Sequence, residues 1–177
     1  EVKMKKKVAI YPGSFDLVTN GHLDIINRSI NLFDEVIIGV LTNYKKKTWF
    51  TPDERVKMLK KIVKHDKISI ESFQGLLVNF ANYKNASVII RGLRAVSDYE
   101  YELQMALTNS TLSKEKVETV FLSASRDNLY LSSSLVKEIA LNNGDISEFV
   151  DKRILEVICK KVEEIKGVAN DKIIGSR

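Results

Sequence analysis

Short apolar runs rich in β-branched residues alternate along the chain with longer segments of helical periodicity. The runs predict strands at 8–11, 36–41, 68–73, 88–90 and 117–122. Strands that alternate with helices pair in parallel, and a parallel sheet is covered by helices on both faces. The run at 68–73 alternates apolar with polar residues, which favours the edge of the sheet. The pattern predicts an α/β fold with a doubly wound, parallel five-stranded sheet of the Rossmann-like type.

Segments with apolar residues at helical spacing lie between and after these runs. The clearest helix start is Thr51-Pro52-Asp53-Glu54, a capping box with proline at the first helical position. Ser133 or Ser134 is expected to cap a later helix that ends near Leu141. The other helices are expected at 23–33, 76–81, 99–112 and 154–165.

Length and composition are those of one globular domain that spans residues 1–177, in which 168–177 is expected to be a poorly ordered tail. The 28 basic and 23 acidic residues give a net charge of +5, an excess that suits an anionic small molecule and does not require a nucleic acid. The single cysteine, Cys159, cannot form an intrachain disulfide, and its apolar helical surroundings predict that it is buried.

Two absences in the sequence bear on location. No apolar run approaches the roughly 20 residues that span a membrane, and the basic N-terminal residues lack the apolar segment of a signal peptide. We therefore expect a cytoplasmic protein with no membrane partner.

Glycine and polar residues follow three of the predicted strands or open the next helix. They are Pro12-Gly13-Ser14-Phe15, Arg91-Gly92-Leu93-Arg94 and Ser132-Ser133-Ser134. Ligands of such sheets bind outside the carboxyl ends of the strands, so these segments are expected to meet at one edge. A helix that starts near Gly21-His22 would direct free amides at the same place, which suits a phosphate. A purely structural interpretation explains the segment from Gly13 to His22 as well as phosphate binding does: the glycines would form turns and His22 would cap a helix.

The segment Tyr11 to His22, YPGSFDLVTNGH, resembles the HxGH signature of nucleotidyltransferases, with Thr19 in the first place. Three further segments narrow the resemblance: FTPDERVKML at 50–59, RGLRAVSDYEYELQMA at 91–106 and LSSSLVKEIA at 131–140. Over about residues 8–160 the chain is similar to the phosphopantetheine adenylyltransferase family. The resemblance implies transfer of the adenylyl group of ATP to 4'-phosphopantetheine, giving dephospho-coenzyme A and pyrophosphate, by in-line attack of the acceptor phosphate without a covalent enzyme intermediate.

The resemblance also implies site residues. The catalytic residues would be His22, Lys46 and Arg91, of which His22 stabilises the transition state. Because lysines also occupy positions 45 and 47, the position of the catalytic lysine is open by one residue in either direction. The ATP-binding residues would be Ser14, Phe15, His22, Gly92, Leu93, Arg94, Glu102, Asn128, Leu129, Tyr130, Leu131, Ser132, Ser133 and Ser134. The substrate-binding residues would be Ser14, Lys46, Leu77 and Arg91.

The cofactor expected from the nucleotide is Mg²⁺, held mainly through ATP phosphates, with no metal ligand from the protein. The family implies a homohexamer, and it makes coenzyme A a plausible inhibitor.

Three alternatives to this function are open at this point. The chain could be another adenylyl- or cytidylyltransferase, for example one that acts on nicotinamide mononucleotide, against which the Arg91–Glu102 segment argues. It could be a nucleic-acid-binding module, although it carries no binding signature for RNA or DNA. It could also be a catalytically silent nucleotide-binding relative, although the expected motif positions are filled.

Overall fold

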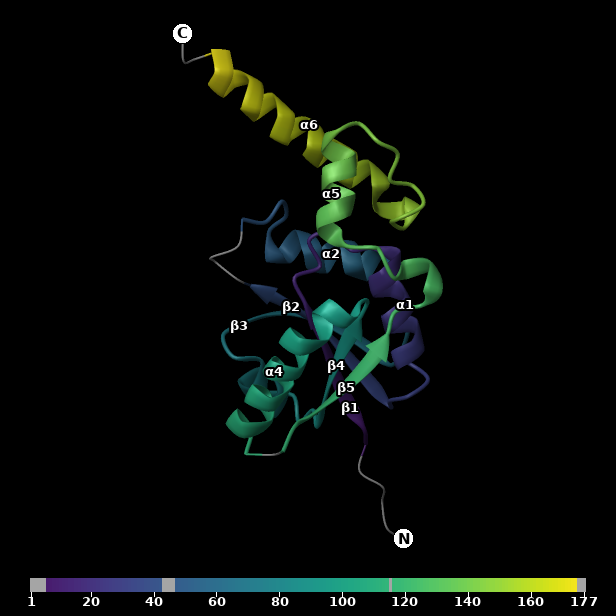
Figure 1. The fold of residues 1–177 in the computed structure, drawn as a ribbon, viewed down its shortest axis with the longest axis vertical. Helices are drawn as coiled ribbons and strands as arrows, with labels where there is room; N and C mark the ends of the chain where they lie inside the picture. Colours follow the sequence, from purple (N-terminus) through teal and green to yellow (C-terminus); the bar gives the residue numbers. More distant parts are fainter. Residues whose placement is uncertain (1–5, 43–46, 115, 175–177) are drawn as a thin grey trace.

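A parallel sheet of five strands, flanked by helices, forms the body of the molecule (Figure 1). The computed structural model describes residues 6–42, 47–114 and 116–174. The strands are β1 (Val8–Gly13), β2 (Glu35–Thr42), β3 (Ile68–Gln74), β4 (Val88–Leu93) and β5 (Glu118–Ser123). The helices are α1 (Asn20–Ser29), α2 (Pro52–Ile62), α3 (Leu77–Tyr83), α4 (Val96–Leu112), the 3₁₀ turn η1 (Arg126–Asn128), α5 (Ser133–Leu141) and α6 (Lys152–Ile174). The predicted fold class is confirmed.

Side chains of alternate strand residues enter two separate cores. In β1, Ala9 and Tyr11 join the larger core, which α1, α2, α5 and α6 cover. Val8 and Ile10 point to the other face and pack with Ala81 of α3. Both faces of β1 are therefore buried, which explains why its sequence is a continuous apolar run rather than an alternating one.

The strand order β3-β2-β1-β4-β5 reverses its direction between β1 and β4. β3 lies at an edge, as its alternating sequence predicts. The β1–β4 ladder pairs Ala9 with Val88 and Ile10 with Ile89, and in the described part of the chain it ends there, although both strands continue. The two strand ends thus leave a crevice at the switch point, where doubly wound sheets bind their ligands.

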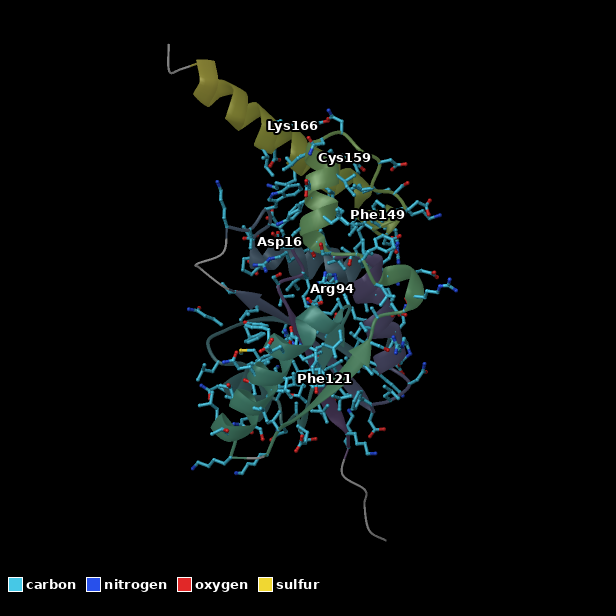
Figure 2. The ribbon with its side chains drawn as sticks, viewed as in Figure 1. Asp16, Arg94, Phe121, Phe149, Cys159 and Lys166 are labelled. Atoms are coloured by element: carbon cyan, nitrogen blue, oxygen red, sulfur yellow. The ribbon has the colours of Figure 1, made fainter. Side chains whose placement is uncertain are left out.

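Two local predictions differ from the structure. The cap of α5 is Ser132, not Ser133 or Ser134, because the Ser132 hydroxyl accepts the Leu135 N–H at 3.1 Å. The prediction that Cys159 is buried is wrong: it is exposed, because it lies one residue beyond Ile158 on a helix that buries every fourth side chain (Cys159 is labelled in Figure 2). The backbone of 168–174 belongs to α6, and the poor order expected for 168–177 stays a prediction.

Helix α6 projects beyond the other elements (Figure 1). None of the helices in the described part of the chain has both the length and the apolar character that a membrane span requires.

A buried carboxylate, that of Asp16, joins three segments around the crevice (labelled in Figure 2). It lies in the loop after β1 and accepts the backbone N–H groups of Trp49 at 3.1 Å and Phe50 at 3.0 Å, from the segment before α2. It also forms an ion pair with Lys137 of α5, whose ammonium lies 5.1 Å from the centre of the Trp49 ring. A charge without solvent contact is tolerated only when it is paired and hydrogen-bonded in this way.

We predict that Lys137→Met lowers the free energy of unfolding by about 3 kcal/mol, because it leaves Asp16 buried without its cation. This loss is at the lower end of the range for breaking a buried ion pair, because the Lys137 side chain is 16% exposed. Urea unfolding measures the loss. Lys160→Met, which removes the cation of an exposed pair with Glu156, is the matched control and should leave the free energy of unfolding nearly unchanged. Equal losses in the two variants would contradict the role given to the Asp16 pair.

Candidate active site

The crevice between β1 and β4 opens into a pocket of about 370 Å³ that we call the polar pocket. Its wall combines the ends of both strands with the starts of α1 and α5, so the three segments predicted to meet at one edge do meet there. The lining residues are Tyr11, Pro12, Gly13, Ser14, Thr19, Gly21, His22, Ile25, Arg91, Gly92, Arg94, Ala124, Asn128, Leu131, Ser132, Ser133 and Ser134. Two helix N-termini and two arginines make this a site for anions.

The loop after β1 folds back over its own glycine. Phe15 has a φ of 49°, in the left-handed region, and its buried ring covers Gly13. A Cβ at Gly13 would lie only 3.0 Å from that ring, so no larger residue fits without moving Phe15. Glycine is therefore required here by the packing of the loop, in addition to any approach of a phosphate to its backbone.

The two ring nitrogens of His22 have different surroundings. Its Nδ1 accepts the backbone N–H of Thr19 at 3.0 Å, which caps the start of α1 in the way that glutamate does in a capping box. Because Nδ1 accepts, the neutral ring carries its proton on Nε2, the nitrogen left for a ligand. Burial, and to a smaller extent the charge of Arg94, lowers the pKa of His22 to about 4. At neutral pH the residue is therefore an uncharged hydrogen-bond donor.

A second hollow of about 490 Å³ runs from the same strand ends along α4, and we call it the apolar pocket. It is lined by Pro12, Gly13, Ser14, Leu41, Phe73, Gly75, Leu76, Leu77, Arg91, Tyr101, Glu102, Met105, Ala106, Thr108, Asn109, Leu112 and Thr119. Pro12, Gly13, Ser14 and Arg91 also line the polar pocket, so the two hollows meet at these four residues. A ligand with a polar end and a long, mostly apolar arm fits this shape.

Arg91 lies where the pockets meet, and its guanidinium is held by Glu102. The Nε and Nη2 groups of Arg91 each donate to one carboxylate oxygen of Glu102 at 2.5 Å. This two-point contact fixes the plane of the guanidinium while leaving further N–H groups for a ligand.

Comparisons with known proteins agree with this geometry. The model of the cytidylyltransferase-like family matches residues 10–139. The phosphopantetheine adenylyltransferase of Alkaliphilus metalliredigens is 53% identical over 156 residues, which are 88% of this chain and 99% of the relative. The protein of the same name from Clostridium perfringens is 47% identical over 162 residues, 91% of this chain and 98% of the relative. The chain belongs to the phosphopantetheine adenylyltransferase family.

Solved structures with much lower identity share the fold. A nicotinic acid mononucleotide adenylyltransferase from Plasmodium falciparum superposes with a TM-score of 0.63 at 14% identity, covering 88% of this chain and 96% of its own. A Vibrio parahaemolyticus protein provisionally assigned as a nicotinate-nucleotide adenylyltransferase gives 0.66 at 16%, covering 89% and 95%. These matches support the Rossmann-like nucleotidyltransferase architecture.

Most of the residues that the family resemblance implies lie in one of the two pockets. Ser14, His22, Arg91, Gly92, Arg94, Asn128, Leu131, Ser132, Ser133 and Ser134 line the polar pocket. Leu77 lines the apolar pocket, as does Glu102, which was expected at the ATP site. Phe15 lies beneath the loop, while Leu93, Leu129 and Tyr130 are not part of the described lining. Lys46, together with Lys45, falls outside the described residues, and Lys47 is exposed. The individual binding roles stay predictions.

Sequence reasoning missed a buried arginine that supports the pocket from behind. Arg55 is 2% exposed, and its Nη1 donates to the carbonyl oxygens of Ser14 at 2.6 Å and Leu41 at 3.2 Å. It thus joins the loop after β1 to the end of β2. A signal was present, since Arg55 falls on the same helix face as Leu59 and Ile62, where an apolar residue is expected.

We predict that His22 makes folding sensitive to mild acid. Between its ordinary pKa of 6.5 and its folded pKa of about 4, the unfolded chain binds a proton at His22 and the folded chain does not. The free energy of unfolding therefore decreases as the pH is lowered, and His22 contributes about 2 kcal/mol of this decrease between pH 7 and pH 5. The side-chain oxygen of asparagine in His22→Asn can still accept from Thr19. Urea unfolding of this variant should show a decrease in the free energy of unfolding between pH 7 and pH 5 that is about 2 kcal/mol smaller than in the unmodified chain. His65→Asn, at the other histidine, is the control. An unchanged pH dependence in His22→Asn would contradict the prediction.

Proposed function

We propose that the chain transfers the adenylyl group of ATP to 4'-phosphopantetheine, giving dephospho-coenzyme A and pyrophosphate. One observation carries the proposal beyond family membership: a polar pocket and a long apolar pocket share a wall at Ser14 and Arg91. The polar pocket suits the triphosphate, and the apolar pocket suits the pantetheine arm. Their junction is where the two phosphates would have to meet.

The reaction would be an in-line displacement at phosphorus. An oxygen of the acceptor phosphate forms a bond to the α-phosphorus of ATP, and the bond from that phosphorus to the bridging oxygen of the β-phosphate breaks, so pyrophosphate leaves. The acceptor phosphate is already an anion, so no general base is required. Catalysis then depends on holding the two phosphates in line and on stabilising charge at the reacting phosphorus.

Three side chains of the polar pocket would do this work. The Nε2–H of His22 donates to an oxygen at the α-phosphorus, and it needs no rearrangement because Nδ1 is already fixed by Thr19. Arg91, oriented by Glu102, holds the acceptor phosphate. Arg94 donates to the Leu131 carbonyl at 3.2 Å, which joins the end of β4 to the loop before α5 on the nucleotide side. The lysine expected near the phosphates, Lys46, completes the proposed set.

Among the described residues no aspartate or glutamate lines the polar pocket, and no group of three or more potential ligands occurs. We therefore propose that any Mg²⁺ arrives with ATP and is held through its phosphates, and we assign no step to the ion. The homohexamer, inhibition by coenzyme A and a cytoplasmic location stay predictions.

The deciding experiment measures pyrophosphate release from ATP with and without 4'-phosphopantetheine. We expect release to depend on this acceptor. Nicotinic acid mononucleotide and nicotinamide mononucleotide, tested in parallel, should not replace it. His22→Ala should bind ATP and lose roughly 10²–10³-fold in kcat, the scale for one preorganised donor. Release that no acceptor stimulates, or that a mononucleotide stimulates more strongly, would overturn the proposed substrate.

Two arginines of the polar pocket should differ in the substrate they serve. Arg91→Ala should weaken 4'-phosphopantetheine by roughly 10–100-fold, the scale of a charge-assisted contact, and ATP by much less. Arg94→Ala, on the side of Leu131, should show the reverse order. The two KM values of each variant give the comparison. Equal effects on both substrates in Arg91→Ala would show that the residue does not serve the acceptor.

A further inference from the structure

We infer that the hydroxyl of Tyr11 binds the ligand of the polar pocket and donates a hydrogen bond to one of its phosphate oxygens. Tyr11 lies near the end of β1 and is not among the residues that the family resemblance implies. The inference deepens the proposed function, on which it rests for the identity of the phosphate-bearing ligand.

The position of the hydroxyl is fixed from three directions. The Tyr11 ring packs edge-on against Phe15, with ring centres 5.5 Å apart, and the residue is 7% exposed. Its oxygen lies 3.8 Å from the place that a Cβ of Gly92 would occupy, so it reaches across from β1 to the end of β4. Ile25 of α1 closes the third side, because its side chain lies 3.3 Å from the same place. The ring cannot turn away without disturbing this packing.

The hydroxyl is nevertheless unused by the protein. No hydrogen bond joins it to another of the described residues. Tyr11 also lines the polar pocket, so the free hydroxyl is in contact with the space that a ligand would fill. Its oxygen is not among the fully buried side-chain atoms that lack a partner, of which the described residues hold one, Thr119 Oγ1, so the hydroxyl faces the pocket and its hydrogen is available to a ligand there.

The surroundings of the hydroxyl select a phosphate oxygen as that partner. Arg91 and Arg94 lie on the same strand end as Gly92 and line the same pocket, so an anion is the ligand they favour. Burial raises the pKa of the Tyr11 phenol, and the two arginines lower it by less, so the group keeps its proton at neutral pH. A protonated phenol can donate its hydrogen to a phosphate oxygen, and the two neighbouring guanidinium groups favour such an anion over a cationic ligand.

The test is Tyr11→Phe, which keeps the ring on Phe15 and removes only the oxygen. Binding of ATP and of adenosine is measured by calorimetry, and kcat/KM by pyrophosphate release. We expect roughly 10–100-fold weaker ATP binding, a similar loss in kcat/KM and unchanged adenosine binding, because the hydroxyl meets phosphate only. Without ligand, the thermal midpoint should stay the same, since no internal hydrogen bond is lost. Tyr83→Phe, at a side chain 79% exposed on α3, should behave as the unmodified chain.

The outcomes separate this inference from the proposed function. Unchanged ATP binding in Tyr11→Phe, or equal losses for ATP and adenosine, would overturn the inference. A lowered thermal midpoint without ligand, with ATP binding intact, would also overturn it and give the hydroxyl a structural role. If the unmodified chain released no pyrophosphate with 4'-phosphopantetheine, the proposed function would fail, while the two binding measurements would still decide the role of Tyr11.

Discussion

The carboxylate of Asp16 is the point at which the walls of the polar pocket are joined. One acid receives the backbone of the segment before α2 and the side chain of Lys137 from α5, and it stands in the loop that carries Gly13 and Ser14. Water cannot replace any of these partners, because Asp16 has almost no solvent contact. The relative placement of these three segments therefore depends on one buried charge. Arg55 adds a second connection to the same loop through the Ser14 carbonyl.

The sheet provides the space that these contacts enclose. β1 and β4 separate after Ile10 and Ile89, so the side of each strand that faces the other opens on the crevice, while β1 stays paired with β2 and β4 with β5. Arg91 and Tyr11 lie beyond this point, and both side chains line the crevice. Their anchors differ, since Glu102 holds the arginine through charge and Phe15 holds the tyrosine through ring packing. A site built on strand ends with such anchors is ordered before a ligand arrives, which lowers the cost of binding.

Periodicity in the sequence was sufficient to predict the layers, because each strand and helix buries one face at its own repeat. It predicted all five strands, the edge position of β3 and the capping box at Thr51, which are local features. It could not predict that Lys137 meets Asp16, since the residues are 121 positions apart and nothing local connects them. It also misjudged Cys159, where a shift of one residue around a helix changes burial to exposure. For the site, the motifs identified three segments of the sequence that do line one pocket in the structure. The supporting residue Arg55 was missed because it resembles an ordinary member of its helix, and Tyr11, although it opens the motif segment 11–22, resembles an ordinary buried strand residue.

The shared wall between the two pockets has a consequence for the product. Each substrate would occupy mainly one hollow, but dephospho-coenzyme A contains both halves in one covalent molecule and would fill both at once. A ligand joined in this way behaves as a bivalent one: when one half lets go, the other keeps it at a high effective concentration beside its site. Departure then requires both halves to be released together. The continuity at Ser14 and Arg91 that would let the phosphates meet would thus also retain the product that they form.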